Sequence, residues 1–273
     1  MKAALIQMNS TADKAANLAQ ARRLIELAVA EEKPDWIGLP EVFDFLGGTR
    51  AEKFDAAETL RRGPAYELAA ELAGKHGVFL HAGSFLERNA DGGTLSNTTV
   101  VFDRQGREIA LYRKIHMFDV VTPDGAAYRE SATFTPGTDL ATYEAEGFTF
   151  GCAICYDLRF PALFEALSAR GVEVFVLPAA FTLLTGKDHW EALCRARAIE
   201  TQSYLLAPAQ VGAHRIKDET RHTYGHSLIC DPWGHVVAKA SDAPGYVTAR
   251  LDAGLIARTR AANPVAAQRR GFS

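Results

Sequence analysis

The segment FTFGCAICYDLRFP, residues 148–161, decides how the rest of the sequence is interpreted. It begins as an apolar run of strand length and changes after Cys155 into the polar turn YDLR, which Pro161 closes. Side chains alternate along a strand, so Phe150 and Cys152 share a face that Cys155 does not. The carboxyl end of a strand, just before a helix, is where α/β proteins bind ligands. Cys155 is therefore a candidate functional residue.

Cys155 has three interpretations. A free cysteine is commonly a small buried hydrophobe, but a structural thiol does not require Asp157 and Arg159 beside it. The spacing Cys152-x-x-Cys155 also suits a redox pair, although such pairs sit at a helix start and Cys152 lies inside the predicted strand. A helix N-terminus would lower the pKa of the thiol, which favours a reactive nucleophile.

The composition excludes several classes of protein. The 273 residues carry a formal net charge of −3 without a basic run, which argues against nucleic acid or an anionic membrane as a partner. The N-terminal apolar run is too short for a signal peptide, and four cysteines in a chain of this length do not suggest a disulfide framework. We expect a cytoplasmic protein that needs no metal or cofactor.

Strand-like and helix-like segments alternate along the chain, with hairpins as well as crossovers, which predicts an α/β fold. No linker or change of composition divides the sequence, so we expect one domain over residues 1–273. The predicted strands include 2–8, 35–41, 78–85, 95–102, 107–114, 148–155 and 172–178, and the predicted helices begin near residues 13, 64, 161 and 189.

Two further predicted strands end in residues that complement a thiol. The strand DWIGLPE ends in Glu41, and REIALYRK ends in Lys114. Taken singly, each is more often a solvated surface residue. A cysteine nucleophile, however, needs a base and a donor for the developing oxyanion, and a carboxylate with a lysine supplies both.

The motifs LPE, YRKIHMFD and GCAICYDLRFP, in this order, resemble the three catalytic motifs of the nitrilase superfamily of carbon–nitrogen hydrolases. The resemblance continues through the segments at 129–131, 189–191, 195–200, 224–227 and 231–234, and covers nearly the whole chain. It implies a four-layer αββα sandwich that assembles into a homodimer or a larger homo-oligomer.

The resemblance also implies a role for each motif residue. Cys155 would attack the substrate carbonyl and Glu41 would transfer protons. Lys114 and the backbone N–H of Tyr156 would stabilise the oxyanion, and Glu130 would orient the substrate and the lysine. The product of the first step would be a thioester that water hydrolyses.

Within the superfamily, the segments CYDLRFP, YGHS and DPWG most resemble the small amidases that act on deaminated glutathione, with ω-amidases of 2-oxoglutaramate close by. Other small aliphatic amides or N-carbamoyl compounds are alternatives. Arg159 is the candidate for binding the keto-acid carboxylate, although an internal salt bridge with Asp157 or Glu165 would explain it equally well. Phe181, Thr182 and Thr185 are expected to line the pocket, and an insert at 216–220 to lengthen a loop at its mouth.

Three other interpretations stay open from the residues alone. A metal-dependent hydrolase would use His214, His222 and His226, but their spacing lacks a compact pair of ligands on a helix. A cysteine–histidine hydrolase would use His116 or His226 as its base. A protein that has lost catalysis has little support, because all three motif residues are present.

Overall fold

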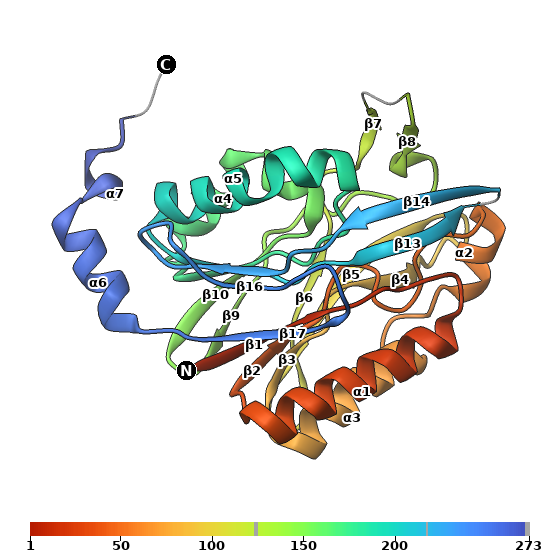
Figure 1. The fold of residues 1–273 in the computed structure, drawn as a ribbon, viewed down its shortest axis with the longest axis horizontal. Coiled ribbons are helices and arrows are strands. Elements are labelled where there is room, and N and C mark those ends of the chain that lie inside the picture. Colours follow the sequence, from red (N-terminus) through yellow and green to blue (C-terminus); the bar gives the residue numbers. More distant parts are fainter. Residues whose placement is uncertain (123–124, 217, 271–273) are drawn as a thin grey trace.

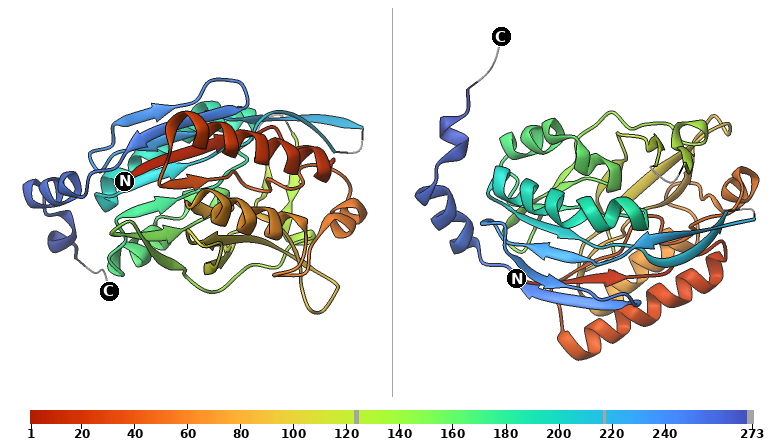
Figure 2. Two further views of the ribbon diagram at one scale, coloured as in Figure 1. Left: turned by 90° about the horizontal axis from the view of Figure 1, so that it is seen from below. Right: turned by 45° about the horizontal axis from the view of Figure 1, so that its top comes forward.

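The computed structural model describes residues 1–122, 125–216 and 218–270. Within these ranges two β-sheets lie face to face, and a pair of helices covers the outer face of each sheet, as Figures 1 and 2 show. The layers follow the order helix, sheet, sheet, helix. The predicted αββα sandwich is confirmed.

The first sheet has parallel strands at its centre and antiparallel strands toward its edges. In the described residues its strands are β1 (Lys2–Gln7), β2 (Trp36–Gly38), β3 (Phe79–His81), β4 (Phe85–Arg88), β5 (Leu95–Phe102), β6 (Glu108–Arg113) and β17 (Gly245–Arg250). Their order is β17–β1–β2–β3–β5–β4, with β6 also paired to β5. Because β1, β2 and β3 run parallel, helices must cross between them, and these helices form one outer layer.

The second sheet repeats this plan. Its strands, in the described part of the chain, are β9 (Thr142–Ala145), β10 (Phe148–Cys152), β11 (Val174–Val176), β12 (Tyr204–Ala207), β15 (Leu228–Cys230) and β16 (Val236–Lys239). β10, β11 and β12 are parallel neighbours, and their crossover helices form the other outer layer. The segment that opened the sequence analysis thus contains a strand of this sheet, which lies between β11 and the edge strand β9.

The helices begin and end at residues that the sequence makes recognisable. Asp13 caps the first helix through a hydrogen bond from the backbone N–H of Ala16, and Gly77, with φ of 62°, ends the helix that Pro64 begins. α1 and α3 cover the first sheet, and α4 and α5 cover the second. The helices are α1 (Lys14–Glu32), α2 (Arg50–Ala56), α3 (Pro64–His76), α4 (Pro161–Ala169), α5 (Leu183–Thr201), α6 (Ala253–Ala262) and α7 (Val265–Gln268).

The alternation of side chains in β1 shows how the layers are held together. Ala3 and Leu5 belong to the core shared with the second sheet, whereas Ala4 and Ile6 pack under α1 and α3. Between the sheets, the ring of Trp36 stacks on Phe150 with 5.7 Å between ring centroids. An apolar strand of this kind is buried on both faces, as expected for a parallel sheet between helices.

Several expectations about local structure were wrong, among them the helix expected from residue 189, which begins at Leu183. The predicted strand 78–85 is two strands, because Gly83 takes φ of 52° against the carbonyl of Pro40, where a side chain has no room. The strand 148–155 ends at Cys152. The insert at 216–220, expected as a loop, belongs to the hairpin of β13 (Val211–Ile216) and β14 (Glu219–Tyr224), with residue 217 outside the described residues. A second small hairpin joins β7 (Asp119–Val121) and β8 (Ala127–Arg129).

Candidate active site

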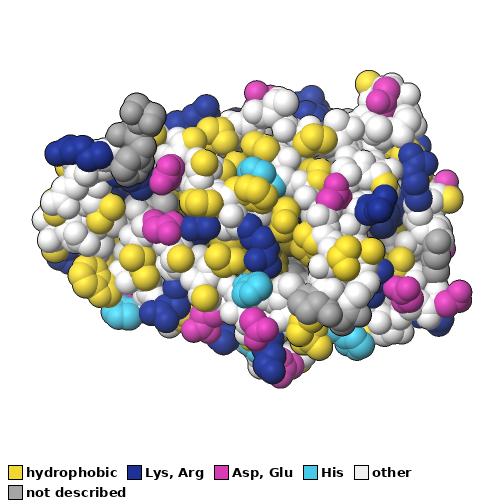
Figure 3. Space-filling model, turned by 90° about the horizontal axis from the view of Figure 1, so that it is seen from above, with side chains coloured by type: hydrophobic (Ala, Val, Ile, Leu, Met, Phe, Trp, Pro, Cys, Tyr) yellow, Lys and Arg dark blue, Asp and Glu magenta, His cyan; other side chains and the backbone are white. Residues whose placement is uncertain are grey.

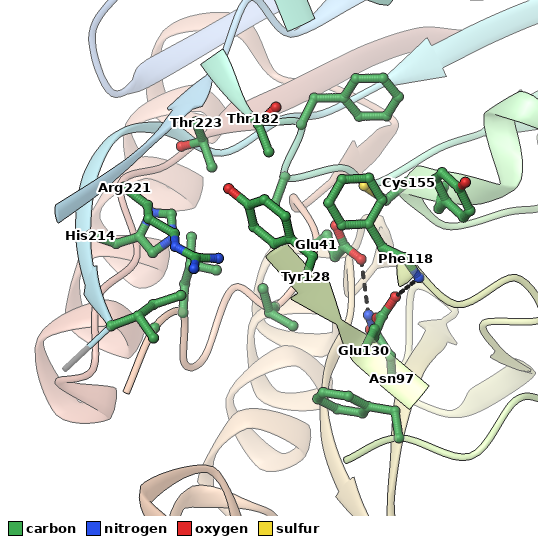
Figure 4. Close-up of a pocket in the computed structure, with 18 of the residues that line it drawn as sticks. Glu41, Asn97, Phe118, Tyr128, Glu130, Cys155, Thr182, His214, Arg221 and Thr223 are labelled. Carbon is green, nitrogen blue, oxygen red and sulfur yellow. Dashed lines mark hydrogen bonds between the residues drawn. The ribbon is translucent and has the colours of Figure 1, made fainter. Parts of the chain in front are cut away.

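Strand ends from both sheets bring the three motif residues together. Glu41 follows β2, Lys114 directly follows β6, and Cys155 follows β10. All three side chains are buried, with exposed fractions of 4%, 2% and 7%. They line one pocket, whose cavity volume is about 320 Å³. Figure 4 shows Glu41 and Cys155 in this pocket.

The backbone presents Cys155 to this pocket in a strained conformation. Its φ of 47° lies in the left-handed region, which costs a residue with a side chain about 1–2 kcal/mol. The backbone N–H of Cys155 donates to the carbonyl of Pro178 at 2.8 Å, and the residue begins a short 3-10 helix that ends at Arg159. The sharp turn replaces the last residues of the predicted strand, and Cys155 lines the pocket at the edge of the core.

Asp157 holds this turn in place. One carboxylate oxygen, Oδ2, accepts hydrogen bonds from the backbone N–H of Ile154 at 2.8 Å and from the hydroxyl of Tyr112 at 2.7 Å. The other, Oδ1, accepts from the backbone N–H of His116 at 3.1 Å and lies 2.7 Å from Nδ1 of the same residue. Asp157 is fully buried, so the polar segment YDLR serves structure as well as chemistry.

Two carboxylates surround one lysine in what we call the pocket cluster, formed by Glu41, Lys114 and Glu130. Nζ of Lys114 donates to Oε1 of Glu41 at 3.0 Å and to both oxygens of Glu130 at 2.9 and 2.8 Å. Glu130 also accepts from the backbone N–H of Phe118 at 2.6 Å. Burial alone would lower the pKa of Lys114, but the two carboxylates outweigh it and raise the pKa well above its ordinary value. The lysine is therefore charged.

The thiol of Cys155 is protonated in this environment. Burial and, after it, the charge of Glu41 raise the pKa of the thiol well above its ordinary value, and Lys114 only partly opposes them. The sequence predicted the opposite direction, because a helix N-terminus alone would lower the pKa. The thiol instead lies in the buried pocket that the Glu41 carboxylate also lines.

Asn97 is a member of the site that sequence analysis missed. It lies in β5 with 2% of its surface exposed, and its Nδ2 donates to Oε1 of Glu41 at 2.9 Å (Figure 4). Its Oδ1 has no hydrogen-bond partner among the described residues. The sequence gives little signal for it, because its neighbours Ser96, Thr98 and Thr99 are polar as well.

The comparisons with known proteins agree with this geometry. Residues 2–261 match the carbon–nitrogen hydrolase family. The chain is 41% identical over 265 residues to the deaminated glutathione amidase of Synechocystis, covering 96% of this chain and 95% of that one. It is 40% identical over 271 residues to the human deaminated glutathione amidase, with 98% and 81% covered.

A solved structure gives the same result. Nit3 of Saccharomyces cerevisiae, a member of branch 10 of the nitrilase superfamily, superimposes with a TM-score of 0.88 at 32% identity, over 99% of this chain and 97% of that one. This chain belongs to the carbon–nitrogen hydrolase family. It is an amidase, and the site described above lies where its motif residues meet.

The remaining residues predicted for substrate binding all line the pocket of this hydrolase. Thr182 caps α5, and its hydroxyl lies 2.8 Å from that of Thr185. Tyr156 follows Cys155 directly, and its ring meets Phe118 edge to face. The predicted lining residues that the structure places here are Tyr156, Arg159, Phe181, Thr182 and Thr185.

Arg159 is free of the internal salt bridge that the sequence allowed. Asp157 is occupied by the contacts described above, and within the described residues neither Asp157 nor Glu165 forms an ion pair with Arg159. The guanidinium instead lies over the rings of Tyr156 and Phe181, at 5.9 and 5.3 Å from their centroids. Its Nη1 lies 3.3 Å from Nδ1 of His189, and the residue lines the pocket.

Of the histidines proposed for the alternative mechanisms, His214 and His222 line the far side of this pocket, whereas His116 and His226 make other contacts. His226 lines no part of the pocket, since its Nδ1 lies 2.8 Å from the carbonyl of Tyr224 and its Nε2 3.3 Å from Asp242. His116 stacks on Phe160 and bonds to Asp157. In the described part of the chain, no three residues of metal-ligating type form a cluster, and no helix has the length and apolarity of a membrane span.

Proposed function

We propose that this hydrolase cleaves deaminated glutathione, a small α-keto-acid amide, through a thioester on Cys155. The observation that carries the proposal is that Cys155, Glu41 and Lys114 line one buried pocket, in which Nζ of Lys114 donates to the Glu41 carboxylate at 3.0 Å. The names of the Synechocystis and human relatives support the substrate. The geometry supplies a nucleophile, a base and a cation within one buried pocket.

In the first step, Glu41 takes the proton of the Cys155 thiol while the sulfur attacks the amide carbon. Because the pKa of the thiol is raised, proton transfer accompanies attack and no thiolate precedes it. The carbonyl oxygen becomes an oxyanion, which Nζ of Lys114 and the backbone N–H of Tyr156 stabilise. That N–H lies in the first turn of the 3-10 helix, where backbone donors lack partners within the helix.

The following steps return every group to its starting state. Glu41 gives its proton to the amide nitrogen, the carbon–nitrogen bond breaks, and the amine leaves a thioester behind. Water then attacks the thioester while Glu41 takes a proton from it. The carbon–sulfur bond breaks, the proton returns to the sulfur, and the carboxylic acid leaves. Glu130 holds Lys114 in position throughout, through both of its carboxylate oxygens.

Arg159 binds the keto-acid carboxylate of the substrate in this scheme. A guanidinium can hold a carboxylate through two parallel hydrogen bonds, and the aromatic rings beneath Arg159 restrict its orientation. Phe181, Thr182 and Thr185 provide the adjoining wall. This assignment follows from the free charge of Arg159, four residues after the nucleophile.

The proposal extends to a homodimer or larger homo-oligomer that works in the cytoplasm. Figure 3 shows apolar side chains gathered on the face that carries α4 and α5, and Leu183 and Ile199 of α5 are 51% and 47% exposed. The four cysteines are unpaired, which is typical of proteins from reducing compartments.

Release of 2-oxoglutarate from deaminated glutathione and from 2-oxoglutaramate tests the function. We expect faster release from deaminated glutathione, and a fall of at least about 10⁴-fold in kcat/KM in Cys155→Ala. Cys194→Ala, which removes a buried thiol of α5, is the control and should retain activity. Faster hydrolysis of 2-oxoglutaramate would assign an ω-amidase instead, and full activity of Cys155→Ala would overturn the mechanism.

A further inference from the structure

The pocket has a second group of basic residues across the cavity from Cys155. Lys53 of α2, His214 of β13 and Arg221 of β14 all line the cavity. His214 and Arg221 are direct partners across the β13–β14 hairpin, which places their side chains next to each other. Figure 4 shows both on the side of the pocket opposite Cys155, with Tyr128 and Glu41 between.

His214 has an open hydrogen-bonding position inside this group. The residue is only 7% exposed, and its Nδ1 has no partner among the described residues. Burial, with the charges of Arg221, His222 and Lys53, lowers the pKa of His214 to about 4, so the ring is neutral at pH 7. A buried polar atom without a partner costs about 1–3 kcal/mol, which a ligand atom would relieve.

The two cations beside His214 are not fully compensated. Lys53 forms no ion pair in the described ranges of the chain, and Glu130 acts on its charge only at longer range. The guanidinium of Arg221 lies 4.3 Å from the ring centroid of Tyr128 and contacts Glu219 at 3.0 Å. The side chain of Glu219 is 67% exposed, so this pair is a weak one at the surface. A net positive charge therefore faces the cavity.

We propose that Lys53, His214 and Arg221 form a second anion subsite, which binds a carboxylate on the amine side of the scissile amide bond. The inference rests on the proposed function. Deaminated glutathione carries one carboxylate on its keto-acid arm and another at the end of its longer dipeptide arm, whereas 2-oxoglutaramate releases ammonia and lacks the second. Arg159 lies on the same short helix as Cys155 and takes the nearer carboxylate. The distant group takes the carboxylate of the leaving dipeptide.

The subsite predicts which substrates the enzyme prefers. Amidation of the glycine carboxyl of deaminated glutathione removes only the second charge, and we expect it to lower kcat/KM by at least about tenfold, as for the loss of a hydrogen bond to a charged group. In the Lys53→Met and Arg221→Gln variants, the ratio of kcat/KM for deaminated glutathione to that for its glycine amide should fall to about threefold or less. The ratio of kcat/KM for deaminated glutathione to that for 2-oxoglutaramate should fall in parallel. Lys187→Met, which removes an exposed charge of α5, should leave both ratios unchanged.

A binding measurement separates this inference from the proposed function. Calorimetry with the Cys155→Ala protein compares deaminated glutathione with its glycine amide, before and after the added Arg221→Gln substitution. The subsite would be supported if deaminated glutathione bound more tightly than its glycine amide and if Arg221→Gln abolished that difference. This would hold even if the wild-type enzyme hydrolysed neither compound. Equal binding of the two compounds, or a preference that Arg221→Gln leaves intact, would overturn the subsite while hydrolysis still decided the function. Thermal unfolding checks that each variant is folded.

Discussion

Among the described residues, two largely buried clusters each combine one lysine with two carboxylates, and one of them lines the active-site cavity whereas the other does not. The pocket cluster is Glu41, Lys114 and Glu130. In the second, which we call the Lys14 cluster, Nζ of Lys14 lies 2.6 Å from Glu58 and 3.2 Å from Asp44. Both clusters carry one negative charge in excess when fully ionised, so charge composition does not distinguish them.

The neighbours of each cluster decide what the excess charge does. Glu58 accepts hydrogen bonds from the backbone N–H groups of Ala65 and Tyr66, at the start of α3. These donors and the positive end of the helix dipole stabilise its negative charge. Asp44 is fully buried, and its burial raises its pKa to about 6. In the pocket cluster, Glu41 instead faces the thiol of Cys155. A buried lysine–carboxylate group is thus structural or chemical according to whether a nucleophile and a cavity lie beside it.

Neutralising one carboxylate in each cluster should give the largest difference between them. Glu41→Gln keeps the shape of the side chain but removes the proton acceptor, so kcat/KM should fall by at least about 10³-fold. Glu58→Gln keeps an acceptor oxygen for α3 and should leave kcat/KM within about twofold. Steady-state hydrolysis of one amide by both variants checks this. Comparable losses in the two variants would show that the pocket cluster is not chemically special.

The Lys14 cluster should instead control the pH dependence of stability. The pKa of Asp44 is about 6 in the folded protein and 3.8 when unfolded, so the folded state holds this proton more tightly. The contribution of Asp44 is therefore fully present below pH 3.8 and is lost as the pH rises toward 6. Above that range, Asp44→Asn should raise the free energy of unfolding by about 3 kcal/mol, since it removes a buried charge that the pKa shift shows to be unfavourable.

Urea unfolding of the wild type and Asp44→Asn between pH 4 and pH 7 measures this effect. The difference between the two proteins should grow with pH and level off above about pH 6. Activity should stay the same in both, because the Lys14 cluster does not line the pocket. A difference that was constant with pH would mean that the charge of Asp44 has no cost in the folded protein.

The sequence predicted the parts of the site that end strands in recognisable motifs. Glu41, Lys114 and Cys155 could be found because each polar residue interrupts an apolar run. Asn97 could not be found from the sequence, because only the structure shows that its side chain lies beside Glu41. The pKa direction of Cys155 failed for a similar reason. A sequence shows the helix that follows, but not the burial and the carboxylate that act against ionisation.

The sequence predicted the strands whose apolar side chains face the core, and it missed strands that have polar side chains on both faces. The run at 148–152 and the first strand have clear apolar faces. The β13–β14 hairpin has polar residues on both of its faces, because one faces solvent and the other a polar cavity, and it gives no strand pattern. Lys53 was missed on α2, a helix with no fully buried residue. The far end of the pocket is therefore the part that only the structure reveals.

Asn97 is the smallest difference between the clusters that can be tested. In the described residues, no side-chain amide donates to a carboxylate of the Lys14 cluster. The hydrogen bond from Asn97 to Glu41 fixes the carboxylate toward the thiol, so Asn97→Ala should lower kcat by about tenfold. KM should change little, since the residue acts on Glu41 and the substrate makes its polar contacts elsewhere. Ser96→Ala is the matched control: its hydroxyl bonds to Asn89 on the opposite face of β5.

Separate kcat and KM values for both variants decide the role of Asn97. A fall confined to kcat in Asn97→Ala, absent in Ser96→Ala, identifies a residue that positions the base. Equal effects in the two variants would indicate that β5 had only lost packing. A rise in KM alone would instead place the unpartnered Oδ1 of Asn97 in direct contact with the substrate. The free oxygen would then accept a hydrogen bond from the amide that the thiol attacks.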